Sequence, residues 1–211
     1  MVRLVRGGFL ALAFVAVAQP AIAQDANTWF QAGTMYDMGQ GTEQNHALAL
    51  EYYLRAAELG HVKAQGTVAE FLTLGTGSAV DYEGAAIWYR RAAEQGDVGA
   101  QYHLALAYDA GRGVAQDYKE AAAWLRRAAT QGDANAQFRL GQLYEAGRGV
   151  SRDLVRAYAW FSVAAAAMTG EEGKSASASR DLAAKQMTPA QITQAQDLVS
   201  KCQRPGAPQC D

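Results

Sequence analysis

Apolar and polar residues follow one another along most of the chain at the spacing of an α-helix. Ala100, Leu104 and Tyr108 fall at positions i, i+4 and i+8, which places them on one helical face. After a polar break, a second apolar stripe at helical spacing runs from residue 121 to residue 129. Gly111 lies between the stripes and ends the first helix, because glycine adopts a left-handed cap without strain. This stretch therefore predicts two helices joined by a short turn.

The same pattern returns every 36 residues. Gly-x-Gly pairs begin at residues 39, 75, 111 and 147. A fixed period of this length is typical of a stacked repeat array. The sequence therefore predicts an all-α protein, an α-solenoid of about four 36-residue helix-turn-helix repeats with a C-terminal capping helix. Further columns keep the same phase: polar Asn45, Asp81, Asp117 and Asp153; aromatic Tyr52, Trp88, Trp124 and Trp160; small Ala49, Ala85, Ala121 and Ala157.

Composition agrees with closely packed helices. Half of the 211 residues are hydrophobic, but about 45 of these are alanines, the best helix formers. The four prolines leave residues 21–188 free of the ring that blocks a helix. With 19% charged residues, four Trp and ten Tyr the chain is not of the disordered class, and two cysteines exclude a disulfide scaffold.

The first 23 residues have the pattern of a secretory signal peptide. Arg3 and Arg6 precede an apolar stretch over residues 9–18, and Ala21-Ile22-Ala23 is a small-residue cleavage site. The apolar stretch is shorter than a membrane span requires. We expect a Sec-type leader over residues 1–23, cleavage after Ala23, no stable membrane anchor, and a periplasmic or secreted protein. Cleavage would leave 17 basic and 21 acidic residues, so no nucleic-acid partner is expected.

The tail, residues 171–211, is interpreted as capping helices and a cross-linked end. Thr188-Pro189 begins a helix that shields the last repeat from solvent, whereas residues 171–179 read as a loop or a weak helix beginning. Cys202 and Cys210 suit a disulfide in an oxidising compartment, since a redox-active pair usually has the tighter C-x-x-C spacing.

One stretch, residues 100–137, resembles the Sel1-like repeat family, a relative of the tetratricopeptide repeat. The resemblance extends from about Trp29 to Met168 and implies a repeat solenoid over residues 24–170. Thr42 and Ser78 depart from the pattern, which puts the bend of the first two loops in doubt. The matching residues are Leu104, Tyr108, Gly111-Arg112-Gly113-Val114, Asp117-Tyr118, Ala121, Trp124, Ala128-Ala129 and Gly132-Asp133.

No catalytic or metal-binding signature is found. His46, His61 and His103 lack a second ligand at metal-binding spacing, so neither a metal nor another cofactor is expected. The glycine pairs are interpreted as helix caps and the aromatic column as core. The paired arginines at 90–91 and 126–127 are interpreted as solvated charges near helix C-termini.

Residues that change type from unit to unit are the candidate binding site. By the resemblance to tetratricopeptide-like solenoids, the variable columns of each first helix line a concave surface. Their mixture of aromatic, polar and acidic groups suits an extended peptide with some positive charge. The candidates are Phe30, Gln31, Thr34, Asp37, Glu70, Tyr102, His103, Leu106, Asp109, Phe138, Arg139, Gln142 and Glu145.

The function expected from this pattern is an exported, non-enzymatic scaffold that binds a protein or peptide partner in the cell envelope. Two alternatives remain open. One is a cell-envelope enzyme that binds or hydrolyses β-lactams, although the family members so described resemble a cysteine-rich variant and this chain has no cysteine in any repeat. The other is a toxin-neutralising binding protein. Whether the ligand is protein, glycan or another copy of the chain is open, as is the oligomeric state.

Overall fold

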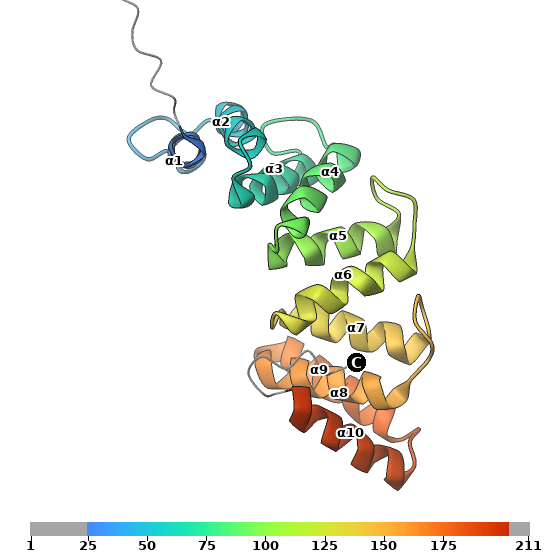
Figure 1. Ribbon diagram of the computed structural model, residues 1–211. Coiled ribbons are helices and arrows are strands. Elements are labelled where there is room, and N and C mark those ends of the chain that lie inside the picture. The colour runs from blue at the N-terminus through green and yellow to red at the C-terminus, as the bar shows by residue number, and fades with distance from the viewer. Residues whose placement is uncertain (1–24, 203–211) are drawn as a thin grey trace, which may run out of the picture.

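The computed structural model describes residues 25–202, which form ten helices and no strand (Figure 1). The all-α solenoid predicted from the sequence is confirmed. Successive helices pack as antiparallel pairs that stack into an elongated, twisting array, with α1 at one end and α10 at the other. The helices are α1 (Ala26–Met38), α2 (His46–Glu58), α3 (Val62–Leu74), α4 (Tyr82–Glu94), α5 (Val98–Ala110), α6 (Tyr118–Thr130), α7 (Ala134–Ala146), α8 (Leu154–Ala167), α9 (Gly170–Ala184) and α10 (Pro189–Cys202).

Helix ends follow from local sequence. The side chain before each of the first eight helices accepts a hydrogen bond from a backbone amide of the first turn, which satisfies a donor that the helix leaves unpaired. The first helix of each pair ends at a left-handed glycine with φ between 66° and 71°. The first two loops therefore bend as the later ones do, despite Thr42 and Ser78. The capping residues are Asp25, Asn45, His61, Asp81, Asp97, Asp117, Asp133 and Asp153.

The second glycine of each pair does more than the sequence predicted. A Cβ atom on Gly113 would lie 1.9 Å from the carbonyl oxygen of Tyr82, the first residue of α4 in the preceding repeat. Gly149 stands in the same relation to Tyr118 of α6, at 2.0 Å. The glycine therefore lets the loops of the second, third and fourth repeats touch the backbone of the unit before them.

A row of buried glutamines also joins neighbouring units. Gln101 is 3% exposed; its Nε2 donates to the carbonyl of Ala93, and its Oε1 accepts from Nε2 of Gln131 at 2.8 Å. Gln65 makes the equivalent pair of bonds one repeat earlier. Buried amides are costly unless bonded, so these bonds fix how the units stack.

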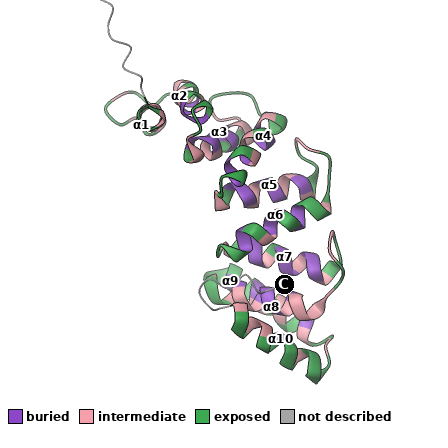
Figure 2. Ribbon diagram, in the orientation of Figure 1, coloured by how far each residue is buried: buried purple, intermediate pink, exposed green. Residues whose placement is uncertain are grey.

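Bulky residues of the second helices fill the space between units, and Figure 2 shows buried residues concentrated where helices meet. Trp124 and Trp160 of the predicted aromatic core column are buried, whereas Tyr52 and Trp88 are half-buried. Phe161 is fully buried and lies over Gly141 of α7, where an added Cβ would come within 2.7 Å of the ring.

The prediction of solvated arginine pairs is wrong for one member of each pair. Arg90 and Arg126 are half-buried and donate hydrogen bonds to the hydroxyl groups of Tyr108 and Tyr144 in the following repeat. The exposed neighbours also have partners. The guanidinium carbons of Arg91 and Arg127 each lie 4.4 Å from the ring centroid of the tryptophan three residues earlier. The guanidinium groups thus form contacts between and within units.

The segment interpreted as a loop or weak helix is part of a full helix, α9. Its sequence is polar, but Gly173, Ala176 and Ala183 are buried, and α9 packs along α8. Packing of small residues, rather than propensity, accounts for this helix. The predicted start of the last helix is confirmed, because Thr188 and Gln191 exchange hydrogen bonds as a capping box.

Several predictions fall at the ends of the chain. The proposed leader, residues 1–23, lies outside the described residues, and so does Cys210, the predicted partner of Cys202. Cys202 is the last residue of α10 and packs against the main core. The division at residue 170 stays a prediction. None of the helices between residues 25 and 202 is long and apolar enough to cross a lipid bilayer.

Candidate functional site

Side chains of α3, α5, α7 and α9 line three adjoining pockets, which we call the inner groove. Each pocket lies where two successive first helices approach each other, with a second helix behind them in two of the three. Leu106 is shared by the first two pockets, and Arg139 and Gln142 are shared by the last two. The three pockets therefore form one continuous surface.

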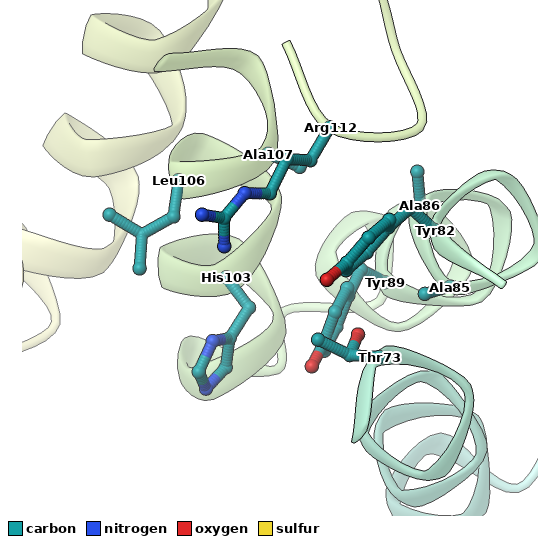
Figure 3. Close-up of a pocket in the computed structure, with 9 residues that line it drawn as sticks. All are labelled: Thr73, Tyr82, Ala85, Ala86, Tyr89, His103, Leu106, Ala107 and Arg112. Carbon is teal, nitrogen blue, oxygen red and sulfur yellow. The ribbon is translucent and has the colours of Figure 1, made fainter. Parts of the chain in front are cut away.

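The first pocket, called the Arg112 pocket, is shown in Figure 3. Tyr82 and Tyr89 of α4 form one wall, and His103 and Leu106 of α5 form the other. The Arg112 side chain reaches in from the loop after α5, with its guanidinium carbon 5.9 Å from the Tyr82 ring centroid. The pocket has a volume of about 120 Å³, and its nine lining residues are Thr73, Tyr82, Ala85, Ala86, Tyr89, His103, Leu106, Ala107 and Arg112.

The second pocket, called the Arg148 pocket, is the same site one repeat later. Its volume is about 330 Å³. For six residues that line the first pocket, the residue 36 positions later lines this one. The chemistry differs because carboxylates are present here. Asp109 takes the place of Thr73, and Glu145 is added at the end of α7. The lining residues are Leu106, Asp109, Leu125, Arg139, Gln142, Leu143, Glu145, Ala146 and Arg148.

The third pocket, called the α7–α9 pocket, lies between α7 and α9, with Tyr102 of α5 at its edge. It has a volume of about 360 Å³ and pairs the aromatic rings of Tyr102 and Phe138 with two carboxylates from the first turn of α9. The remaining lining residues belong to α7, α9 and the turn before α9. The full set is Tyr102, Asn135, Phe138, Arg139, Gln142, Met168, Glu171, Glu172 and Ser175.

The structure brings eight of the thirteen predicted site residues into the inner groove. The other five lie on α1 and α3, outside the three pockets. Those in the groove are Tyr102, His103, Leu106, Asp109, Phe138, Arg139, Gln142 and Glu145. Those outside it are Phe30, Gln31, Thr34, Asp37 and Glu70.

Three of the five outlying residues serve the packing of the first repeat. Phe30 stacks on the ring of His61 with centroids 4.5 Å apart. Thr34 and Asp37 both accept hydrogen bonds from the Tyr53 hydroxyl, and burial raises the pKa of that tyrosine. Gln31 and Glu70 are exposed. The prediction of a binding surface on α1 therefore has less geometric support than the prediction for α5 and α7.

Tyr89 is the most perturbed titratable group of the groove. Burial raises its pKa to about 12, a hydrogen bond with Thr73 acts in the opposite sense, and the charge of Glu70 adds to the increase. The phenol therefore stays neutral at physiological pH. Its ring stacks on His103 with centroids 5.2 Å apart, which holds the imidazole at the pocket wall.

Sequence reasoning missed several residues of the groove. Tyr82 and Arg112 lie in or beside loops, so the search for variable columns on first helices did not reach them. Glu171 and Glu172 lie in the segment interpreted as a loop or a weak helix beginning, which was not considered as a binding surface. The recurrence of Arg112 at Arg148, 36 residues later, was the available signal. Among residues 25–202, no group of three or more His, Cys, Asp or Glu side chains could hold a metal ion.

Comparison with known proteins gives the family. A model described as the Sel1 repeat matches residues 30–61, 63–97, 98–133 and 134–167. The chain belongs to the Sel1 repeat family. Proteins of this family are generally protein-interaction scaffolds and typically not catalysts. No curated protein matches the chain.

Solved structures match this chain to different extents. A Sel1 repeat protein from Oxalobacter formigenes is 30% identical, with a TM-score of 0.69 over 83% of this chain and 79% of that one. The c5321 protein, described as a protective antigen present in uropathogenic Escherichia coli strains, is 28% identical with a TM-score of 0.57; the match covers 89% of this chain and 47% of that one. Cysteine-rich protein B of Helicobacter pylori is 23% identical, with a TM-score of 0.46 over 59% of this chain and 89% of that one.

Proposed function

We propose that this Sel1 repeat protein is an exported, non-enzymatic scaffold that binds an extended peptide segment of a partner protein along the inner groove. The observation that supports the proposal is the row of three adjoining pockets, lined mostly by residues that change type from repeat to repeat, around an arginine that recurs at 112 and 148. An extended chain can place successive side chains in such a row of pockets.

The charges of the groove support a polar partner segment. The Arg148 pocket and the α7–α9 pocket contain both signs of charge, with Arg139 shared between them and carboxylates on either side of it. Aromatic rings at Tyr102 and Phe138 add apolar surface between the charged groups. Such a surface suits a segment with both apolar and charged side chains, whose successive residues contact successive pockets.

A fourfold alanine variant tests the groove. Tyr102, His103, Arg139 and Gln142 would be replaced together, because their side chains line the groove and none is fully buried. A displayed library of random peptides, about 12 residues long, would be panned on the wild-type protein. We expect selected peptides to bind the variant at least about tenfold more weakly, a loss of about 1.4 kcal/mol.

The matched control replaces exposed residues away from the groove. Lys119, Ala123 and Arg127 of α6 are exposed and do not line any of the three pockets. Lys119→Ala with Arg127→Ala is expected to leave peptide binding at the wild-type level. Circular dichroism should show equal helicity in all variants. Equal affinity of the fourfold variant and the wild type would refute the groove as the binding surface.

Export is part of the proposal and rests on the leader pattern of residues 1–23. We expect protein recovered from the periplasm or the medium to begin at Gln24, because Ala21 and Ala23 form the small-residue cleavage site. Amino-terminal sequencing of the isolated protein measures this directly. Recovery of the protein from the cytoplasm with residues 1–23 intact would contradict export.

A further inference from the structure

The Arg112 pocket differs from its neighbour in one respect that concerns the ligand. Its lining contains the guanidinium of Arg112 but no carboxylate, whereas the Arg148 pocket has Asp109 at the position of Thr73 and Glu145 as an additional lining residue. In the repeat pattern, Thr73 stands where the next repeat has Asp109. The first pocket therefore carries a positive charge that no residue lining it balances.

Arg112 has no ion pair within residues 25–202. The one described partner of its guanidinium is the face of the Tyr82 ring, 5.9 Å from the guanidinium carbon. Glu70 influences Tyr89 through space, but its side chain is exposed and does not line the pocket. The guanidinium is thus free to form a bidentate pair with a carboxylate that enters the pocket.

The walls favour an anion with an apolar stem. Tyr82, Tyr89 and His103 present ring faces or edges, and Ala85 and Leu106 add aliphatic surface (Figure 3). A volume of about 120 Å³ has room for one side chain. Arg112 is itself an exposed residue, so a side chain that enters the pocket from solvent can reach its guanidinium.

We propose that the Arg112 pocket binds the side chain of an acidic residue, glutamate in particular, from a peptide lying in the inner groove, with the carboxylate on Arg112 and the methylene groups between Tyr82, Tyr89 and His103. This inference rests on the proposed function and specifies its ligand chemistry. At this end of the groove, Arg112 would disfavour the positively charged peptide that was expected from the sequence.

The test uses a blocked tripeptide and the histidine ring signals. The chain has three histidines, of which His103 lines the pocket, while His46 and His61 both lie in the first repeat and serve as internal references. Acetyl-Ala-Glu-Ala-amide would be titrated at fixed pH and followed by proton NMR. We expect the ring signals of His103 to shift and those of His46 and His61 to stay in place. The affinity obtained from the His103 shift should be at least about tenfold lower for the Gln tripeptide.

Protein variants separate the pocket from a general charge effect. Arg112→Gln should abolish the difference between the Glu and Gln tripeptides. Arg148→Gln is the matched control, since Arg148 lies over the Tyr118 ring at 5.7 Å as Arg112 lies over Tyr82, but in a pocket that contains carboxylates. That variant should keep the Glu preference. Thr73→Asp, which introduces the acidic residue of the next repeat, should weaken Glu binding at least about tenfold.

Other results would overturn the proposal. An equal response to the Glu, Gln and Leu tripeptides would show a general apolar pocket. A stronger response to acetyl-Ala-Leu with a free carboxyl end would show a site for a chain terminus. If the Arg112→Gln variant still bound the Glu tripeptide more tightly than the Gln tripeptide, the carboxylate would not be bound by Arg112. Failure of this titration while the panned peptides still bind the groove would remove the inference and leave the proposed function standing.

Discussion

Gly113→Ala is expected to lower the free energy of unfolding by about 3 kcal/mol. A left-handed alanine costs about 1 kcal/mol, and the collision adds the overpacking penalty of a well-packed interface, about 2 kcal/mol. The collision is with backbone, because the new Cβ would lie 1.9 Å from the carbonyl oxygen of Tyr82 and 2.3 Å from its carbon. Equilibrium unfolding in urea, followed by circular dichroism, measures the change.

Gly41→Ala is the matched control for this prediction. Gly41 has a φ of 73°, close to the 70° of Gly113, but no atom lies within 4 Å of its Cβ position. We expect a loss of about 1 kcal/mol, due to backbone strain alone. If the two variants lose the same stability, contact between the loop and the preceding unit does not hold the stack together.

Phe161→Ala is expected to cost about 3 to 5 kcal/mol, the range for removing a buried aromatic ring. Phe161 is fully buried, lies against Gly141 of α7, and has its ring centroid 5.6 Å from that of Phe138. Because glycine offers no side chain to fill the vacated space, we expect the cavity to persist. A urea unfolding curve again gives the loss.

Leu182→Ala provides the comparison, since Leu182 is an exposed apolar residue of α9 with 56% of its surface accessible. It should change stability by about 0.5 kcal/mol or less. A loss for Phe161→Ala as small as this would mean that α7 and α8 close the cavity by moving together. The helicity of both variants should match the wild type in the absence of urea.

The inner groove was only partly predictable from the sequence. Columns that change residue type on α5 and α7 pointed to His103, Arg139 and Gln142, because packing positions keep their type and these do not. The same rule selected Phe30 and Asp37, which the first repeat uses for its own packing. A residue type that varies along a repeat column shows only that the common packing of the repeat does not require one residue there. It does not tell whether the position belongs to a binding surface or to packing that is particular to one repeat.

Arginine partners were the least predictable feature. Arg90 and Arg91 are adjacent in sequence and both near a helix end, yet one bonds Tyr108 in the next repeat and the other covers Trp88 in its own. Neighbouring positions on a helix point about 100° apart, so their surroundings depend on the docking of the next unit. The buried Gln101 stands 36 residues after Gln65. This repeated glutamine also indicated how the units dock on one another, although composition alone did not reveal it.

The sequence by itself determined the repeat length, the two helices of each unit and their caps. These depend on interactions within a few residues: a side chain such as Asp117 bonding the next turn, or Gly111 taking a left-handed φ. Only the tertiary structure decided which side chains share a pocket, what α9 packs against, and that Arg112 enters a pocket without a carboxylate. Those features depend on how units rotate against one another, and that rotation is fixed by contacts between units, such as Gly113 against Tyr82 and Arg126 with Tyr144.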